Sequence, residues 1–378
     1  MSAREGLIFG PDRMPHRLHG LFADSLPDAW GHVVADRHFA STSLPRERVT
    51  VLDRLAFVGT RGMGALVYRP PEEQTSAAFT PDVDLLHDEA ERVLAGTSSE
   101  VLPQLIAAAG ASGGARPKVL VGINDEGKMM AGADMLPEAY TAYLVKLGSH
   151  LDDPEAPGLE FAYHQMAGRA GIRVPHARLL RSARARYFAI ARFDRTAAHR
   201  IHMLTGSGLT NAPHDYFAVE YGELGHLIAK VSKDYDEAHE FARRMVFNVL
   251  AHNRDDHLKN TAMLMDEDGS WRLSPAYDLT FMAGPGGEHS MLIAGEGRSP
   301  TAEHMLKAGE AMGVDRPEMR SIIDQVAIAV GEWNAFADEA ELSPGRRLEI
   351  AATLNRTRSE VLSAFAFGTN RPATTSKK

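Results

Sequence analysis

The chain has 378 residues, 44% of them hydrophobic, which predicts two or three domains of ordinary globular composition. Lys and Arg number 41 and Asp and Glu number 50, so the net charge of −9 argues against direct binding of nucleic acid by the chain alone. The absence of cysteine excludes disulfides, thiolate nucleophiles and cysteine-based zinc sites. No apolar run approaches the roughly 18 residues of a membrane span, and the first residues lack a secretion signal, so we expect a cytoplasmic protein with no membrane partner.

Residues 1–70 have the pattern of a small α/β subdomain. Helical periodicity predicts helices over 28–37, with Asp28 at the N-cap position, and over 51–58. Residues 65–68 then have the composition of a short strand.

Residues 84–195 are expected to form a second, mixed unit, separated from the first by a polar, proline-containing linker at 71–83. Its first part shows helical periodicity, and its later parts contain short runs typical of strands. The expected elements are a helix over 84–110 that is interrupted near Gly96, strands over 119–123 and 143–146, a helix over 159–167, and paired strands over 177–180 and 187–192.

A glycine-rich loop, residues 113–118, precedes the first of these strands and has the sequence Gly-Gly-Ala-Arg-Pro-Lys. Glycines at such a place let backbone N–H groups approach phosphate oxygens closely. The sequence matches neither of the common phosphate-binding loop patterns, so a simple flexible loop is the alternative interpretation.

Lys146 ends the second predicted strand, and Glu160 follows at the start of a predicted helix. In kinases a lysine on such a strand contacts the α- and β-phosphates of ATP and pairs with a helix glutamate. A lysine at a strand end is usually just exposed to solvent. The kinase interpretation of this pair therefore depends on the motifs that follow it along the chain.

Residues 196–368 are predicted to be mainly helical, and residues 369–378 form a polar tail that we expect to be disordered. Phe241, Met245 and Val249 lie on one helix face that leads into a polar loop. Further helices are expected over 302–312, 317–338 and 345–366, the last with Leu348, Ala351, Ala352 and Leu362 on its core face.

The polar loop, residues 253–260, has the spacing of a kinase catalytic loop. Asp255 follows an arginine and precedes Asn260 by five positions. In kinases this aspartate accepts the proton of the attacking hydroxyl group, and the asparagine holds a magnesium ion. Asp278 comes after a predicted hairpin, where a second acid would hold magnesium from the other side. The order of these residues predicts phosphoryl transfer from ATP with Mg²⁺.

His252 and His257 flank Asp255, which raises the alternative of a metal-dependent hydrolase. Two histidines five positions apart do not match the His-x3-His spacing that one helix face presents to zinc. We therefore interpret them as loop histidines.

Several motifs occur together along the chain. Residues 255–260 read Asp-Asp-His-Leu-Lys-Asn, 275–278 read Pro-Ala-Tyr-Asp, and 192–195 read Arg-Phe-Asp-Arg. Residues 22–28 read Phe-Ala-Asp-Ser-Leu-Pro-Asp, and 58–66 contain Val-Gly-x3-Met-Gly-Ala-Leu. With the glycine loop and the strand lysine, these motifs resemble those of the HipA family of bacterial serine/threonine kinases, the toxins of HipA–HipB-type toxin–antitoxin pairs.

The resemblance implies an α+β, two-lobed, protein-kinase-like fold with a small N-terminal α/β subdomain. Residues 84–195 would form the small β-rich lobe with the phosphate loop, and residues 196–368 the larger, mostly helical lobe with the catalytic loop. It further implies ATP and Mg²⁺ as cofactors, a protein serine or threonine as acceptor, with aminoacyl-tRNA synthetases as the best-known substrates in the family, and a HipB-like DNA-binding antitoxin as partner.

The resemblance also implies roles for single residues. Asp255 would be the catalytic base, and Asn260 and Asp278 would hold the metal. The residues implied to bind ATP are Gly113, Gly114, Ala115, Arg116, Pro117, Lys118, Lys146, Ala191, Arg192, Phe193, His257, Lys259, Asn260, Tyr277 and Asp278.

The chain departs from the family pattern at two places. The family's toxins phosphorylate their own serine in the loop before the glycines, where this chain has Ala111, with Ser112 one residue further on. Either Ser112 takes over as autophosphorylation site, or this off-switch is missing. The N-terminal subdomain also starts abruptly, which leaves its contacts with an antitoxin open.

Two alternatives to a protein kinase remain at this point. One is a kinase of small molecules on the same fold, because no motif in the sequence identifies the acceptor. The other is a non-catalytic binding protein with a kinase-like fold, which is disfavoured because Asp255, Asn260 and Asp278 are all chemically competent.

Overall fold

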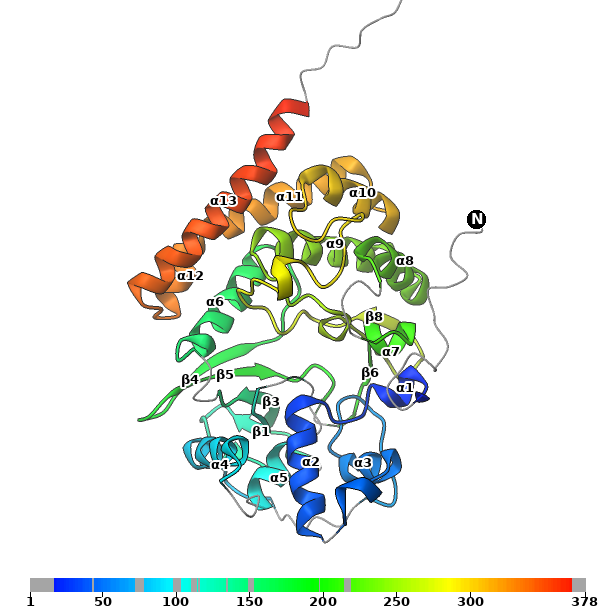
Figure 1. Cartoon of the computed structure of the whole chain (residues 1–378), viewed down its shortest axis with the longest axis vertical. Coiled ribbons are helices and arrows are strands. Elements are labelled where there is room, and N and C mark those ends of the chain that lie inside the picture. The colour runs from blue at the N-terminus through cyan, green and yellow to red at the C-terminus, as the bar shows by residue number, and fades with distance from the viewer. Residues whose placement is uncertain are drawn as a thin grey trace, which may run out of the picture.

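The computed structural model contains a five-stranded sheet and a three-stranded sheet, surrounded by helices (Figure 1). The described residues are 17–42, 44–71, 78–97, 103–109, 114, 116–133, 135–148, 153–196, 198–213 and 219–368. None of the helices in these ranges is both long and apolar enough to cross a lipid bilayer.

Helices and strands follow one another in the order expected of a mixed α+β protein. The α-helices are α1 (Gly20–Ala23), α2 (Ala29–Ser41), α3 (Val51–Val58), α4 (Val83–Ala95), α5 (Pro103–Ala109), α6 (Ala156–Arg169), α7 (Gly206–Thr210), α8 (Tyr221–Ser232), α9 (Tyr235–Leu250), α10 (Ala302–Met312), α11 (Arg316–Gly331), α12 (Trp333–Glu339) and α13 (Pro344–Gly368). The strands are β1 (Lys118–Asn124), β2 (Met129–Met130), β3 (Tyr140–Lys146), β4 (Ala177–Arg181), β5 (Arg186–Ala191), β6 (His202–Thr205), β7 (Ala262–Met265) and β8 (Trp271–Leu273). Short 3-10 helices are η3 (Arg46–Arg48), η4 (Leu258–Asn260) and η5 (Pro285–Gly287).

The five-stranded sheet has the antiparallel order β2-β1-β3-β5-β4 and two different faces. Side chains alternate across a strand, so Val119 and Val121 enter one core, which also contains Trp30 and Leu86 from the preceding helices. Helix α5 contacts β1 on this side, and α2 and α4 pack on α5. The other face carries Lys118 and Lys146, which are directly opposite each other in the β1–β3 register, and α6 packs against β5 and β4.

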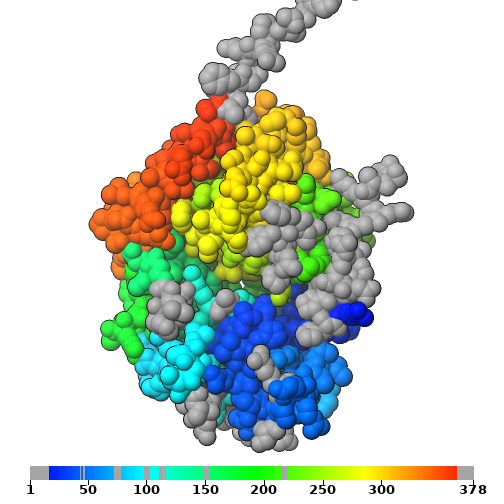
Figure 2. All heavy atoms as spheres, viewed as in Figure 1, coloured from blue at the N-terminus to red at the C-terminus, as the bar shows by residue number. Residues whose placement is uncertain are grey.

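A second core holds the C-terminal lobe together. Phe241 and Met245 of α9 are completely buried in it, with Leu224, Met305 and Trp333 from neighbouring helices. The sheet β6-β7-β8 lies at the border of this lobe, and the loop between α9 and β7 carries Asp255. Figure 2 shows the two parts meeting along a seam, with blue and cyan residues below and yellow to red residues above.

Most predicted elements are confirmed, and three expectations are wrong. Residues 65–68 form no strand, because their neighbour Gly64 donates its N–H to the Asp194 carboxylate and Tyr68 donates to the carbonyl of Gly59, so no sheet partner is used. The helix expected over 317–338 is two helices, because the chain turns at Glu332 and buries the Trp333 ring.

The third error concerns the face of α13. Leu348 is 71% exposed and Ala352 is exposed as well, whereas Ile350, Leu354 and Val361 are buried. Apolar residues are spread around this helix, so its packing on α9–α12 selects the buried face. The break at Gly96 is confirmed, since this residue ends α4 with a left-handed φ of 69°. The predicted domain boundaries at 70, 83 and 195 stay predictions.

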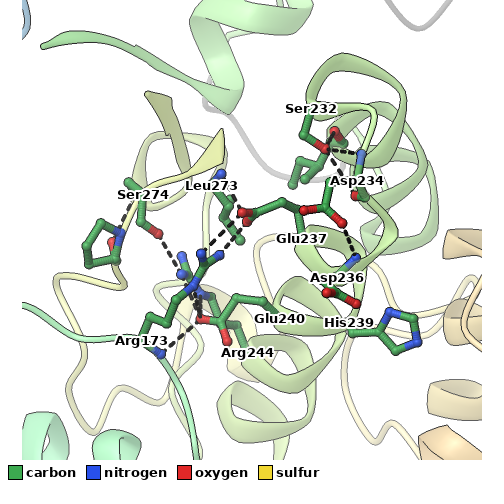
Figure 3. Close-up of polar contacts among 12 residues, drawn as sticks. Arg173, Ser232, Asp234, Asp236, Glu237, His239, Glu240, Arg244, Leu273 and Ser274 are labelled. Atoms are coloured by element: carbon green, nitrogen blue, oxygen red, sulfur yellow. Dashed lines mark hydrogen bonds and ion pairs between the residues drawn. The ribbon is translucent and has the colours of Figure 1, made fainter. Parts of the chain in front are cut away.

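A buried charge cluster joins α9 to the chain segment that leads to Asp278 (Figure 3). Arg244 donates to Glu240 at 2.8 and 2.9 Å and to the carbonyl of Ser274 at 2.6 Å. Glu237 accepts from Arg173 and from the N–H of Leu273, the latter at 3.1 Å. Because the carbonyl of Arg173 also accepts from the N–H of Ala276 at 2.7 Å, the cluster fixes the backbone just before Asp278.

Removing the Arg244 guanidinium should strongly destabilise the fold. The change Arg244→Met leaves the Glu240 carboxylate, 9% exposed, without its main cation, which costs about 3–5 kcal/mol in the free energy of unfolding. Urea unfolding measures this, with Arg169→Met as the control, because Arg169 forms an exposed ion pair worth at most about 1 kcal/mol. Similar losses in the two variants would contradict a structural role for the cluster.

Candidate active site

Lys146 lies at the centre of the site and connects three elements. Its ammonium group donates to Glu160 of α6 and, at 2.5 Å, to Asp278, and Glu160 also accepts from Arg116 at 2.9 Å. Burial alone would lower the pKa of Lys146, but Asp278 and Glu160 outweigh it and raise this pKa above its ordinary value. The same attraction holds the pKa of Asp278 well below its ordinary value despite the effect of burial. The lysine–glutamate pair that active kinases require is therefore in place.

Lys118 supplies a second positive charge beside this network. It is 4% exposed, and burial lowers its pKa against the attraction of Asp278. A Cβ atom on Gly114 would lie 2.5 Å from the Nζ atom of Lys118, and Gly114 has a left-handed φ of 98°. The left-handed backbone favours glycine at position 114, and a side chain there would also displace the end of the lysine.

Asp28 is a member of the site that the sequence did not identify as functional. It stands at the N-cap position of α2 as predicted, but its side chain does not cap the helix. It accepts from Lys259 at 2.8 Å and from the N–H of Gly114 at 2.7 Å, and these contacts lower its pKa although burial opposes them. The N-terminal subdomain thus ties the glycine loop to the catalytic loop. The Phe-Ala-Asp-Ser-Leu-Pro-Asp motif was the only sequence signal for this.

The catalytic loop presents Asp255 and Asn260 from opposite ends of one turn. The Nδ2 atom of Asn260 donates to the carbonyl of Asp255 at 2.6 Å, and the Nε2 atom of His257 lies 3.8 Å from the Asp255 carboxylate. Burial raises the pKa of Asp255 above its ordinary value; His257 opposes this and Asp278 adds to it. A carboxylate with a raised pKa is suited to accept a proton.

The residues expected to hold Mg²⁺ fit that ion chemically. Magnesium prefers hard oxygen ligands, which the carboxylate of Asp278 and the amide oxygen of Asn260 provide. The amide nitrogen of Asn260 donates a hydrogen bond to the Asp255 carbonyl. The amide oxygen of Asn260 therefore faces away from that hydrogen bond. Asp278 adopts a left-handed φ of 57°, a backbone conformation that is uncommon outside glycine and typical of functional turns.

An apolar surface lies beside these charges on the same face of the sheet. Leu120 and Leu144 are opposite each other in the β1–β3 register and are only partly buried. Phe193 and Tyr277 approach each other with ring centroids 5.6 Å apart, and the Tyr277 hydroxyl donates to the carbonyl of Lys259 at 2.6 Å. The two leucines were not among the predicted site residues, because alternation alone did not reveal which strand face meets the other lobe.

The predicted Arg192–Phe193 segment has a structural role as well. The Arg192 guanidinium bonds the buried Asp194 at 2.7 and 2.9 Å, and Asp194 in turn accepts from Arg195 at 2.9 Å. Arg195 also donates to the carbonyl of Gly64 at 2.7 Å, which fastens the N-terminal subdomain. The N–H groups of Ala191 and Arg192 are engaged as well, since they donate to the carbonyls of His176 and Ala142 at 2.8 Å.

Some predicted residues cannot be located. Gly113, Ala115 and Ser112 fall outside the described residues, as does the tail over 369–378. Arg116, which the resemblance assigns to ATP, pairs with Glu160 at 2.9 Å, and its role toward ATP stays a prediction. A cavity of about 690 Å³ opens beside Lys146, Glu160 and Arg116.

Comparisons with known proteins bear on the family and the fold. Residues 110–333 match the model of the HipA-like C-terminal domain, and residues 3–69 match the HipA N-terminal domain. The solved HipA in the Shewanella oneidensis MR-1 complex of HipA, HipB and operator DNA superimposes with a TM-score of 0.68, covering 91% of this chain and 85% of that one. At 16% sequence identity this likeness shows the fold alone.

One curated relative is similar in sequence as well. The protein named "Putative kinase Y4dM" from Sinorhizobium fredii is 31% identical over 152 residues, which is 36% of this chain. The match spans 37% of that protein's own length. Fold and site together define a two-lobed, kinase-like α+β protein. Since one family model covers more than half of the chain, the chain belongs to the HipA family.

Replacing Lys146 should destabilise the protein in a pH-dependent way. The change Lys146→Met leaves Asp278 without its cation and Glu160 with Arg116 alone, which costs about 3 kcal/mol at neutral pH. The folded-state pKa of Asp278 is lowered, so the stability it contributes is present above its ordinary value of 3.8 and is lost as the pH falls through the folded value. The raised pKa of Lys146 means that its contribution is present below its ordinary value of 10.5. The deficit should therefore be large at pH 7 and shrink below about pH 4.

Urea unfolding at both pH values checks this, with Lys128→Met as the control, since Lys128 forms an ion pair that is 70% exposed. If Lys146→Met lowers the free energy of unfolding by the same amount at pH 7 and at pH 3, Lys146 does not pair with these carboxylates.

Proposed function

We propose that this chain is an ATP- and Mg²⁺-dependent serine/threonine protein kinase of HipA type and the toxin component of a toxin–antitoxin system. The observation that carries the proposal is the convergence of the buried Lys146 and Glu160 and the partly buried Asp278 on one ionic contact. It lies beside a loop that carries Asp255 and Asn260. A structural salt bridge alone would not require an asparagine and a second acid at these positions.

The proposed reaction moves the γ-phosphoryl group of ATP to an acceptor hydroxyl. The bond between the γ-phosphorus and the bridging oxygen of ADP breaks, a bond to the acceptor oxygen forms, and the acceptor proton passes to Asp255. The raised pKa of Asp255 supports this role, because it brings the carboxyl group closer to the range of a useful base. Mg²⁺ held by Asn260 and Asp278 would supply charge neutralisation at the phosphates.

Lys146 and Lys118 are assigned to the phosphates, together with backbone N–H groups of the glycine loop. Gly114 can come close to a ligand because it lacks a side chain, and Gly113 and Ala115 are proposed on the resemblance alone. Lys259 and His257 complete the phosphate side. Asp28 orients Lys259 toward the glycine loop, so we assign it a positioning role.

The adenine is assigned to the partly buried apolar face of the sheet. Leu120 and Leu144 would contact one face of the adenine ring, and Tyr277 and Phe193 would lie at the border of this apolar surface. Ala191 and Arg192 are assigned to the edge of this surface on the resemblance alone, because their N–H groups donate to the carbonyls of His176 and Ala142 and the Arg192 side chain is engaged by Asp194.

The acceptor and the partner follow from the family. A protein of the translation apparatus, such as an aminoacyl-tRNA synthetase, is the proposed substrate. A HipB-like DNA-binding antitoxin is the proposed partner, which is supported by the HipA–HipB–DNA complex of the structural relative. The chain itself has a net charge of −9, which fits recruitment to DNA through a partner better than direct binding.

Removing the base should abolish phosphoryl transfer without unfolding the protein. The change Asp255→Asn keeps the side-chain shape but removes the proton acceptor, so turnover should fall by at least about 100-fold. Incubation with γ-labelled ATP and a cell lysate measures it and separates a labelled protein from a labelled metabolite. Asp125→Asn, in an exposed turn, is the matched control. Normal turnover in a folded Asp255→Asn protein would disprove the assignment.

Ser112 is the proposed autophosphorylation site. It lies one residue beyond the position of the family's serine, so the flexible glycines that follow must let the backbone bring its hydroxyl group into place. A phosphate there would bring nearly two negative charges into a loop that receives phosphates, and so would oppose ATP binding. Peptide mapping by mass spectrometry after long incubation with MgATP should find phosphate on Ser112 in the wild type and none in Asp255→Asn. An active wild type without phosphate on Ser112 would rule this site out.

A further inference from the structure

The segment that follows Asp278, residues 281–298, is fastened to the catalytic loop by the two residues on either side of Asp255. Neither Arg254 nor Asp256 takes part in the proposed chemistry. We propose that both are positioning residues, which hold this segment against the catalytic loop without any phosphate on the segment. The inference rests on the proposed kinase function and adds to it how the acceptor side of the site is kept in order.

The Arg254 side chain donates hydrogen bonds to backbone carbonyls of the segment. Its guanidinium donates to the carbonyls of Gly287 and Arg298, the latter at 2.9 Å, with a longer contact of 3.5 Å to Ala283. Its backbone N–H donates to the carbonyl of Met282 at 3.1 Å. One side chain therefore bridges both ends of the segment.

Asp256 holds the middle of the same segment from inside. Its carboxylate is fully buried and accepts from the N–H of Ser290 and from the His289 ring, both at 2.7 Å. The hydroxyl group of Tyr221 on α8 donates to it at 2.7 Å as well. The Ser290 hydroxyl completes the link by donating to the carbonyl of Arg254 at 3.0 Å.

The backbone of the segment is shaped for this contact. Gly284 has a left-handed φ of 72°, and a Cβ atom there would lie 2.2 Å from the carbonyl oxygen of Glu288 and 2.8 Å from the Cβ atom of Arg254. No side chain fits in that space, so the turn over η5 can approach Arg254 only with glycine at 284. In Figure 2 the residues coloured yellow, which include this segment, form part of the surface of the upper lobe.

Many kinases order this part of the chain only after a phosphate is added, which then pairs with arginine. Here the arginine already has carbonyl partners, and the buried Asp256 side chain accepts hydrogen bonds from the middle of the segment. Ser290 cannot serve as the phosphate acceptor of the segment, because it is 3% exposed and its hydroxyl is bonded. The segment is thus ordered by the sequence itself, and the kinase requires no activating phosphorylation at this place.

Hydrogen exchange in the ATP-free protein tests the clamp directly, because it does not depend on kinase activity. In Arg254→Met and in Asp256→Asn, the amides of residues 282–298 should exchange about 10–100-fold faster, which corresponds to the loss of one hydrogen bond to a charged group. Tyr221→Phe removes one hydrogen bond to Asp256 and should speed the exchange of the same amides to a smaller degree. This milder variant keeps the test valid if Arg254→Met or Asp256→Asn fails to fold. Arg298→Met removes an exposed ion pair from the same segment and should leave its exchange unchanged.

Activity measurements then show whether order matters for the reaction. In Arg254→Met, kcat/KM for the acceptor should fall by at least tenfold while the Kd for MgATP stays within about twofold, and Arg254→Lys should recover part of the loss. Phosphatase treatment of the wild type should neither speed the exchange of residues 282–298 nor lower turnover. Unchanged exchange in both Arg254→Met and Asp256→Asn, or a phosphatase-treated protein that loses order, would overturn the proposal. Faster exchange with unchanged acceptor kinetics would overturn the positioning role as well. A wild type that transfers no phosphate at all would instead refute the proposed kinase function.

Discussion

The buried contact of Lys146 with Glu160 and Asp278 is the constraint on which the rest of the structure depends. Two carboxylates and one ammonium group come from a strand, a helix and a turn that are far apart in the sequence, and each would be expensive to bury alone. Their attraction therefore favours a single arrangement of the two lobes, with α6 against the sheet and Asp278 beside Lys146. The left-handed backbone of Asp278 and the Arg173–Glu237–Glu240–Arg244 cluster serve the same end, since they fix the turn that presents this carboxylate. Binding of a metal-bound nucleotide would exchange part of this internal attraction for contacts with phosphate and Mg²⁺.

The N-terminal subdomain belongs to the site rather than being an appendage. Asp28 reaches both Lys259 and the N–H of Gly114, and the loop around Gly64 is held by Asp194 and Arg195. The contacts are partly buried and charged, so they are stronger than ordinary surface pairs. A partner that moves this subdomain would therefore act on the glycine loop and on the catalytic loop at once.

The order of the site residues could be predicted from the sequence because phosphoryl transfer imposes fixed residue types at fixed spacings. Asp255, Asn260, Asp278 and the Lys146–Glu160 pair lie together as the motif order indicated. Residues whose role depends on packing could not be predicted. Asp28 was predicted only as a helix cap, because the residues around it do not indicate its contact with the distant Lys259. The buried face of α13 and the break before Trp333 were missed because neighbouring helices, not periodicity, select them. The strand expected over 65–68 did not form: Tyr68 donates its N–H to the carbonyl of Gly59, and the neighbouring Gly64 is held by Asp194 from the following unit.

Calorimetric titration with ATP, with and without Mg²⁺, tests most directly the claim that the site around Lys146 and Asp278 binds a metal–nucleotide complex. The account predicts that the wild type binds ATP at least about tenfold more tightly when Mg²⁺ is present, and that Asp278→Ala loses this difference. Asp268→Ala, an acid in the exposed hairpin turn, should behave like the wild type. Equal affinity with and without Mg²⁺ in the wild type, or an undiminished Mg²⁺ effect in Asp278→Ala, would contradict the account.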